Sequence, residues 1–201
     1  MNIVKVKICG IQNLEVALAA IDAGADYLGF NFVKSSRRYV DPERVKEIMD
    51  GIAKSERGVK FVGVFQDEDV DRVNEIAKFL GLDYVQLHGD EDSVYVRRVA
   101  AKVIKRVDED FEVNKGGVEG LEYLLIDRKV QGVGKMVAFK KANDMAGNFL
   151  CFVAGGLSPE NVAEVVRKVR PYGVDVAGGV ERNGKKDVKK IREFIRNAKY
   201  I

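Results

Sequence analysis

Short apolar runs and longer amphipathic segments alternate along the whole sequence. The apolar runs are rich in valine, isoleucine, leucine and phenylalanine, and each has the length of a β-strand. Because they are apolar at nearly every position, they predict parallel strands that are covered on both faces. The expected strands are residues 5–9, 25–32, 60–65, 83–87, 102–107, 122–127, 149–154 and 173–176.

The segments between these runs carry helix start and stop signals. Asp41-Pro42-Glu43 places a capping aspartate before a proline at the first helical position, and Ser158-Pro159-Glu160 repeats the pattern. Gly24 and Gly81 stand where helices should end. The expected helices are residues 14–23, 42–54, 69–80, 92–101, 138–145 and 187–199, with another that begins at Ser158. Residues 108–119 give no clear pattern and predict a short or degraded fifth helix.

This alternation predicts the fold class. Eight βα units in 201 residues fit an α/β protein of the (β/α)8-barrel, or TIM-barrel, type with eight parallel strands. A doubly wound open sheet is the competing architecture, but the strand count favours the barrel and no dinucleotide-type glycine motif follows the first strand. No linker or shift in composition divides the chain, so we expect residues 1–201 to form a single domain.

Charge and composition narrow the class of partner. Lysine and arginine number 34 and aspartate and glutamate 31, which gives a formal net charge of +3, and the two signs are interleaved. The absence of a basic block argues against nucleic-acid binding, while a mildly positive surface suits a small anionic substrate. No apolar run approaches the roughly 20 residues that span a bilayer, and no signal-peptide core is present. We therefore expect a cytoplasmic protein without a membrane partner.

Cysteine and histidine usage points to one candidate thiol. Two cysteines and one histidine make neither a zinc motif nor a disulfide framework. Cys9 ends the first strand beside Gly10, and in a βα barrel the carboxyl ends of the strands face the active-site mouth. Lys7 shares its strand face, where the positive charge favours a thiolate. Cys151 lies within an apolar run, which indicates a buried structural thiol. Position alone leaves Cys9 open between that interpretation and catalysis.

Other polar residues stand at predicted strand ends. Asp127 ends the sixth strand, as a turn-forming aspartate or as an acid at the mouth. Gln86 and His88 alternate at the end of the fourth strand and share one side, although a lone histidine is commonly a hydrogen-bonded structural group. Arg37 and Arg38 follow the second strand and are either solvated or bind an anion, since guanidinium groups match carboxylate and phosphate geometry.

Two glycine pairs predict a phosphate site. Gly155-Gly156 follows the seventh strand, and Gly178-Gly179 follows the eighth. Glycine lets backbone N–H groups approach a phosphate closely, and a helix N-terminus adds partial positive charge. Either pair alone is commonly a turn, but βα barrels often bind phosphate between these two loops.

Taken together and in chain order, these residues resemble the phosphoribosylanthranilate isomerase family over the whole chain. The matching segments are Val6-Lys7-Ile8-Cys9-Gly10-Ile11, Ser36-Arg37-Arg38-Tyr39-Val40, Gln86-Leu87-His88-Gly89, Gly155-Gly156-Leu157 and Arg170-Pro171-Tyr172-Gly173-Val174-Asp175-Val176. The resemblance implies an isomerase of tryptophan biosynthesis. It would carry out an Amadori rearrangement of N-(5-phosphoribosyl)anthranilate and use no metal and no cofactor.

The same resemblance implies individual roles. Cys9 would be the general base, Asp127 the general acid, and Arg38 the group that holds the anthranilate carboxylate. The other implied substrate-binding residues are Gln86, His88, Gly155, Gly156, Asp175, Gly178 and Gly179. The partner would be the small phosphosugar substrate, and the chain would be a monomer or a homodimer, since the family contains both.

Two loops depart from the family pattern and keep an alternative open. The usual Asp-Val-Ser-Ser-Gly-Val-Glu after the eighth strand is Asp175-Val176-Ala177-Gly178-Gly179-Val180-Glu181 here, without the two hydroxyls. Lost neutral hydrogen bonds of about 0.5–1.5 kcal/mol each would weaken phosphate binding. Residues 131–139 also differ from the usual pattern. The alternative function is a non-catalytic or differently specific phosphosugar-binding barrel. A pentose-phosphate epimerase would need several histidines for its metal, and the motifs of an indoleglycerol-phosphate synthase are absent.

Overall fold

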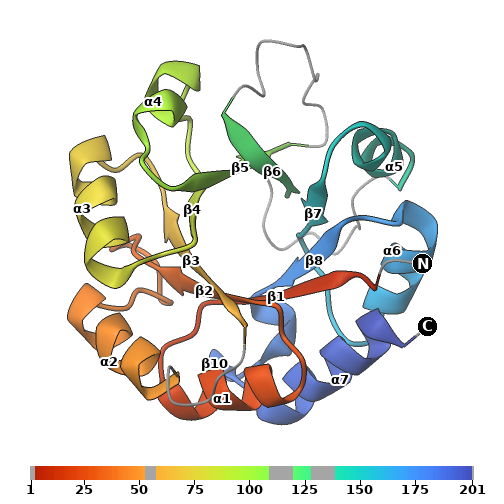
Figure 1. Ribbon diagram of the computed structural model, residues 1–201. Helices are drawn as coiled ribbons and strands as arrows, with labels where there is room; N and C mark the ends of the chain where they lie inside the picture. Colours follow the sequence, from red (N-terminus) through yellow and green to blue (C-terminus); the bar gives the residue numbers. More distant parts are fainter. Residues whose placement is uncertain (1–2, 53–57, 109–119, 128–138, 201) are drawn as a thin grey trace.

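Eight parallel strands close into a barrel in chain order, from β1 beside β2 round to β8 beside β1 (Figure 1). The computed structural model describes residues 3–52, 58–108, 120–127 and 139–200. The strands are β1 Lys5–Cys9, β2 Tyr27–Asn31, β3 Lys60–Phe65, β4 Tyr84–Leu87, β5 Lys102–Val107, β6 Leu121–Ile126, β7 Cys151–Val153 and β8 Gly173–Val176. The predicted α/β fold class, a (β/α)8 barrel, is confirmed.

Helices form a ring outside the strands in Figure 1. They are α1 Leu14–Asp22, α2 Pro42–Ile52, α3 Val70–Leu80, α4 Ser93–Arg98, α5 Phe139–Asn148, α6 Val162–Val169 and α7 Val188–Lys199. Side chains of residues before several helices accept hydrogen bonds from first-turn N–H groups, as Asp69 and Asp187 do. The predicted short fifth helix covers residues 108–119, of which residues 109–119 lie outside the described residues.

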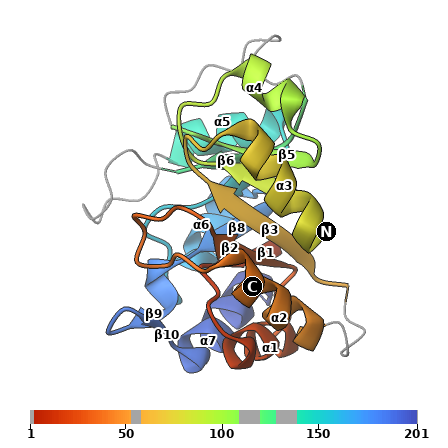
Figure 2. The ribbon, with the colours of Figure 1, turned by 90° about the vertical axis from the view of Figure 1, so that its left-hand side faces the viewer.

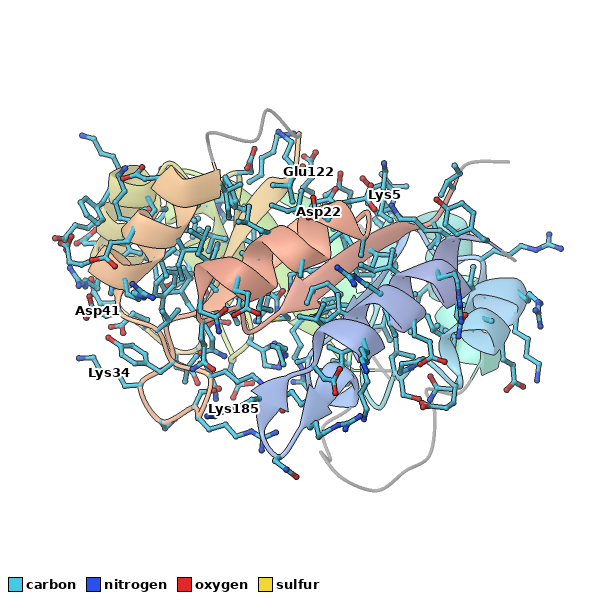
Figure 3. All side chains as sticks on the ribbon, turned by 90° about the horizontal axis from the view of Figure 1, so that it is seen from below. Lys5, Asp22, Lys34, Asp41, Glu122 and Lys185 are labelled. Carbon is cyan, nitrogen blue, oxygen red and sulfur yellow. The ribbon has the colours of Figure 1, made fainter. Side chains whose placement is uncertain are left out.

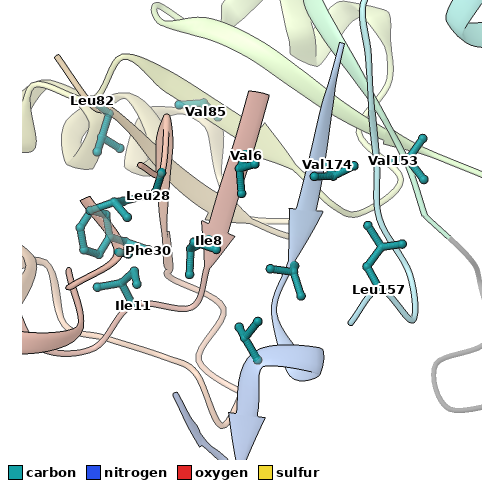
Figure 4. Packing of buried hydrophobic residues seen from close by; sticks show 14 of the residues in the cluster. Val6, Ile8, Ile11, Leu28, Phe30, Leu82, Val85, Val153, Leu157 and Val174 are labelled. Carbon is teal, nitrogen blue, oxygen red and sulfur yellow. The ribbon is translucent and has the colours of Figure 1, made fainter. Parts of the chain in front are cut away.

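Two separate cores hold the barrel. The larger core lies between strands and helices, where outward-facing residues such as Ile8, Leu28 and Val174 are fully buried (Figure 4). The smaller core fills the barrel interior. Its members are Tyr27, Val62, Tyr84, Ile104, Tyr123, Leu125, Phe152 and Ala154. These interior side chains form a solid floor, so a ligand site must lie beyond it at the carboxyl ends of the strands.

Strand register determines which residues lie side by side at the carboxyl ends of β1, β2 and β8. Lys7 of β1 pairs with Asp175 of β8, and Cys9 pairs with Gly29 of β2. Because side chains alternate between the two faces of a strand, Lys7 and Cys9 both point inward, while Ile8 points to the helices. The predicted shared face of Lys7 and Cys9 is therefore confirmed.

The chain departs from the expected elements after β7 and β8. Helix α6 begins at Val162, so the predicted start at Ser158 is wrong, and Ser158 instead donates its N–H to the Asn161 side chain (2.8 Å). After β8 come a 3-10 turn, η2 Gly178–Val180, and a small hairpin of β9 Glu181–Arg182 and β10 Lys185–Lys186. The hairpin and the loop after β2 lie at the end of the barrel opposite the N-terminus (Figure 2).

Candidate active site

A lysine, an aspartate and a thiol meet at the top of β1 and β8. Lys7 is fully buried, and its Nζ donates to Asp175 Oδ1 at 3.0 Å. Cys9 is 8% exposed. A Cβ placed on Gly29 would lie 2.9 Å from Cys9 Sγ and 3.1 Å from Lys7 Nζ, so both groups press against this glycine. The absence of a side chain at Gly29 makes room for the thiol and the ammonium to lie together.

Electrostatics keep the Lys7 ammonium charged. Burial alone would lower the pKa of Lys7, but the Asp175 carboxylate and a hydrogen bond and charge interaction with Cys9 outweigh it and raise this pKa above the ordinary value. A charged donor therefore lies beside the Cys9 sulfur. Cys151 differs, because it is fully buried in β7 and its burial raises the pKa of its thiol to about 12. The predicted structural role of Cys151 fits this environment.

A second polar group lies over β4 to β6. The Gln86 amide lies 3.3 Å from His88 Nδ1, and His88 Nε2 lies 3.6 Å from Asp127 Oδ2. If the amide donates to Nδ1, the ring proton is on Nε2 and faces the carboxyl group of Asp127. The predicted shared side of Gln86 and His88 is confirmed, and the contacts of this pair extend to Asp127.

The imidazole of His88 is held towards its neutral form. Burial is the largest cause, and it lowers the pKa of His88; the Asp127 carboxylate opposes this effect, and the Arg106 guanidinium adds to it. Asp175 and Lys7 also act on His88 electrostatically. The two polar groups therefore share one mouth.

Arg106 is a site residue that sequence reasoning missed. It is mostly buried on β5 and forms an ion pair with Asp108. Within the described residues, Arg106 Nε and Gln86 Oε1 are buried without a hydrogen-bond partner. Two-residue alternation from Ile104, an interior residue, would have placed Arg106 on the same face. Lys105, the next residue back along β5, instead donates hydrogen bonds to the Glu91 carboxylate and to the Gly89 carbonyl.

The two glycine loops touch each other. Gly155 and Gly156 have φ of 81° and 69°, which favours glycine at both positions. A Cβ on Gly179 would lie 1.8 Å from the Leu157 carbonyl oxygen, so the loop after β8 can pack on the loop after β7 only without a side chain there. The loops that carry Gly155, Gly156, Gly178 and Gly179 thus form one continuous backbone surface.

Arg38 crosses from the end of β1 to the end of β8. A Cβ on Gly10 would lie 2.6 Å from Arg38 Cδ, and one on Gly178 would lie 3.4 Å from Arg38 Nη2. The guanidinium is not free in this structure. Its Nε and Nη2 donate to the two carboxylate oxygens of Glu181, at 2.6 and 3.1 Å. Arg38 is therefore at the mouth, as predicted, but already holds one carboxylate.

Charged side chains lie at both ends of the barrel. In Figure 3, Lys34 and Lys185 lie at the edge that carries the mouth, and Lys5 and Glu122 lie at the opposite edge.

Among the described residues, no cluster of three histidine, cysteine or acidic residues could hold a metal ion. No helix in the described part of the chain is long and apolar enough to span a membrane.

The arrangement supplies a thiol beside a cation, a carboxyl group beside a histidine, an arginine, and a glycine surface suited to an anion. The family model for N-(5'-phosphoribosyl)anthranilate (PRA) isomerase matches residues 6–197. The Bacillus cereus (strain ATCC 14579) N-(5'-phosphoribosyl)anthranilate isomerase is 41% identical over 96% of this chain and 98% of its own length.

Solved structures agree with the sequence relatives. The Thermotoga maritima phosphoribosyl anthranilate isomerase has a TM-score of 0.84 at 37% identity, with 97% of this chain and 98% of that chain covered. A phosphoribosyl anthranilate isomerase in complex with reduced 1-(o-carboxyphenylamino)-1-deoxyribulose 5-phosphate has a TM-score of 0.81 at 36% identity, again covering 97% and 98%. This chain belongs to the phosphoribosylanthranilate isomerase family.

Proposed function

We propose that this chain converts N-(5-phosphoribosyl)anthranilate into 1-(2-carboxyphenylamino)-1-deoxyribulose 5-phosphate in tryptophan biosynthesis, with Cys9 as general base and Asp127 as general acid. The observation that carries the residue assignment is the pair of polar groups at one mouth. Cys9 lies against the Lys7 ammonium, and Asp127 faces His88. Acid–base chemistry on a sugar needs a donor and an acceptor at different atoms, and this mouth supplies both.

Ring opening is the first step of the proposed reaction. Asp127 donates its proton to the ribose ring oxygen as the C1′–O bond breaks, and the nitrogen lone pair forms the C1′=N bond. The His88 N–H, 3.6 Å from Asp127 Oδ2, then stabilises the carboxylate that remains. The neutral imidazole favoured by burial can keep this donor role without adding a full charge.

Proton removal is the second step. The Cys9 thiolate takes the C2′ proton, the C–H electron pair forms the C1′=C2′ bond, and the C1′=N pair returns to nitrogen. The resulting enolamine tautomerises to the ketone when C1′ gains a proton and the C2′ hydroxyl loses one. No atom is gained or lost overall. The Lys7 ammonium stabilises the thiolate that starts this step.

Binding holds the two anionic ends of the substrate. Backbone N–H groups of Gly155, Gly156, Gly178 and Gly179 would bind the phosphate, because their loops form one surface without side chains. Arg38 would bind the anthranilate carboxylate through the guanidinium edge that Glu181 does not occupy. Gln86, His88 and Asp175 line the sugar between these ends.

Loss of substrate fluorescence tests the assignment, with freshly generated phosphoribosylanthranilate as the substrate. We expect turnover by the wild type and a loss of about 100-fold or more in kcat for Cys9→Ala and for Asp127→Asn. Cys151→Ala is the matched control, since that thiol is fully buried in β7, and its turnover should stay near that of the wild type. Near-normal turnover by Cys9→Ala would rule out the base.

A differently specific or non-catalytic phosphosugar barrel is the second candidate. Ala177 and Gly178 favour it, because they offer no hydroxyl to a phosphate. The same assay separates the two candidates. Thermal stabilisation by inorganic phosphate without turnover of the anthranilate substrate would support the second candidate.

A further inference from the structure

The hairpin after β8 holds a carboxylate where three cations meet. Glu181, at the start of β9, has a side chain that is only 6% exposed. It accepts hydrogen bonds from Arg37 Nη2 at 2.7 Å, from Arg38 as described above, and from Lys186 Nζ at 3.0 Å. One carboxylate therefore ties the loop after β2 to the hairpin that follows β8.

The pairing fixes the direction of the Arg38 guanidinium. Glu181 takes the Nε and Nη2 edge with both of its oxygens. Within the described residues, both side-chain hydrogen bonds of Arg38 use that edge, and the Nη1 and Nη2 end is left for another acceptor. A side-on carboxylate at one edge of a planar guanidinium leaves the end-on edge aligned for a second carboxylate.

Lys186 fixes Glu181 in turn. Its side chain is 5% exposed, and Nζ donates to the Ala177 carbonyl at 2.8 Å as well as to Glu181. Ala177 directly precedes Gly178, so Lys186 connects Glu181 to the glycine loop after β8. Burial lowers the pKa of Lys186, while Glu181 and the nearby Cys9 oppose that effect, which places Lys186 within electrostatic range of the thiol.

The charge balance also suits a bound anion. Arg37, Arg38 and Lys186 surround a single carboxylate, so the cluster keeps excess positive charge at the mouth. Arg37 is 62% exposed and adds little, whereas Arg38 and Lys186 are well shielded from solvent. A surplus that is shielded from water attracts an incoming anion more strongly than a solvated one.

We propose that Glu181 is a positioning residue that aims Arg38 at the carboxylate of the aromatic ring of the substrate, and that Lys186 holds Glu181 in place. The proposal rests on the proposed function, because it takes the Arg38 ligand to be that carboxylate. The proposal predicts a selective effect on binding. Removing Glu181 or Lys186 should weaken binding of carboxylated ligands and leave binding of ligands without that group almost unaffected.

The experiment compares two reduced product analogues by calorimetric titration. One carries the 2-carboxyphenylamino group, and the other carries a phenylamino group without the carboxylate. We expect Glu181→Gln to weaken binding of the first by about tenfold and of the second by less than about twofold. In turnover, the KM of Glu181→Gln should rise with kcat little changed. Lys186→Met should show the same selectivity to a smaller degree.

Controls separate positioning from general loss of structure. Glu164→Gln removes an exposed carboxylate of α6 that pairs with Lys168, and it should change neither titration. Adding Glu181→Gln to Arg38→Met should cost nothing further, because Glu181 acts through Arg38. Unfolding temperature checks that each variant folds.

Two different failures are distinguishable. If the wild type does not prefer the carboxylated analogue, the proposed function is wrong and this inference is wrong with it. If the wild type does prefer it and Glu181→Gln and Lys186→Met keep that preference in full, only the positioning role is overturned. Equal weakening of both analogues by Glu181→Gln would also overturn it, since that result indicates a structural role.

Discussion

At the scale of single residues, the site is a set of charges that hold each other in place. Lys7 and Asp175 form a buried pair, and both would be costly to bury alone. Their pairing leaves the ammonium free to act on Cys9 as well, since an ammonium has three donors. The same residues therefore contribute to the fold and, in our proposal, to the chemistry.

Removing one member of this pair should separate stability from thiol reactivity. Lys7→Met leaves the Asp175 carboxylate buried without its partner, and we expect a loss of about 3–5 kcal/mol in the free energy of unfolding. Lys7→Met with Asp175→Leu should recover most of that loss. Alkylation of Cys9 by iodoacetamide should be slower in the double variant than in the wild type, because the sulfur has lost the neighbouring Lys7 ammonium.

Denaturant unfolding and mass spectrometry measure these two quantities. Lys102→Met is the control, because it removes an exposed lysine from the amino-terminal end of β5. Its alkylation rate and stability should match the wild type. Wild-type alkylation rates in the double variant would contradict the proposed effect of Lys7 on Cys9.

The pKa of the single histidine can be predicted and measured directly. His88 is the one histidine of the chain, so its ring signal in proton NMR is unambiguous. Burial and Arg106 lower the pKa of His88 while Asp127 raises it, so Asp127→Asn should lower this pKa further and Arg106→Met should raise it. An upward shift in Asp127→Asn would contradict the observed pairing.

This pKa also gives the direction of a stability effect. Because the fold favours the neutral ring, the unfolded chain binds more protons near pH 6. The contribution of His88 to stability is complete above the unfolded pKa of about 6.5 and falls as pH drops towards the lower folded pKa. Acid titration of unfolding in wild type and His88→Gln should show this difference.

At the scale of elements, the phosphate surface depends on contact between two loops. Gly179→Ala would place a methyl group against the Leu157 carbonyl, where a Cβ lies only 1.8 Å from the oxygen. The loops after β7 and β8 must then separate. We expect a KM increase of about tenfold or more and loss of thermal stabilisation by inorganic phosphate, because the N–H groups no longer converge.

A second glycine provides a control of opposite sign. Gly147 lies in α5 with nothing within 4 Å of an added Cβ. Gly147→Ala should keep phosphate binding and raise stability by up to about 1 kcal/mol through helix propensity. Phosphate binding that is equal in both alanine variants would show that the loop contact is not needed.

Local pattern predicted most elements, and it failed where chain signals conflict. The Asn183-Gly184 pair, with φ of 51° and 76°, is a strong hairpin signal, yet it was missed because charged residues flank it instead of alternating apolar ones. The Ser158-Pro159-Glu160 pattern suggested a helix start, but Asn161 satisfies Ser158 N–H and the helix begins later. Both errors adjoin the glycine loops.

The site itself was only partly predictable for a physical reason. Strand ends and two-residue alternation placed Cys9, Asp127 and His88 at the mouth. Lys186 could not be placed in this way, because it reaches the site through a hairpin turn that reverses the chain. The role of each residue in the reaction stays a prediction, as do the single domain and the monomer or homodimer state.

At the scale of the whole molecule, the carboxyl ends of the strands carry the candidate site, whereas the opposite end of the barrel carries contacts that stabilise the fold. Below the mouth, the interior floor contains a hydrogen-bonded set of tyrosines. The Tyr172 hydroxyl bonds to Tyr27 at 2.8 Å and to Tyr123 at 3.1 Å, and the Tyr172 carbonyl accepts from Lys5 N–H where β1 meets β8. This set joins strands that are far apart in the chain and closes the ring.

Tyr172→Phe should therefore reduce stability without reducing activity. It leaves the hydroxyls of Tyr27 and Tyr123 without their shared partner, which should cost about 1–3 kcal/mol and lower Tm by several degrees. The kcat and KM should stay near wild-type values, because the change lies at the opposite end of the barrel from Cys9. Tyr200→Phe, at a position that is 79% exposed, is the control and should leave Tm unchanged. Thermal unfolding and steady-state turnover, measured on the same samples, check both parts. A fall in kcat that matches the fall in Tm would mean that the floor and the mouth are coupled, and the separation of the two ends would then be wrong.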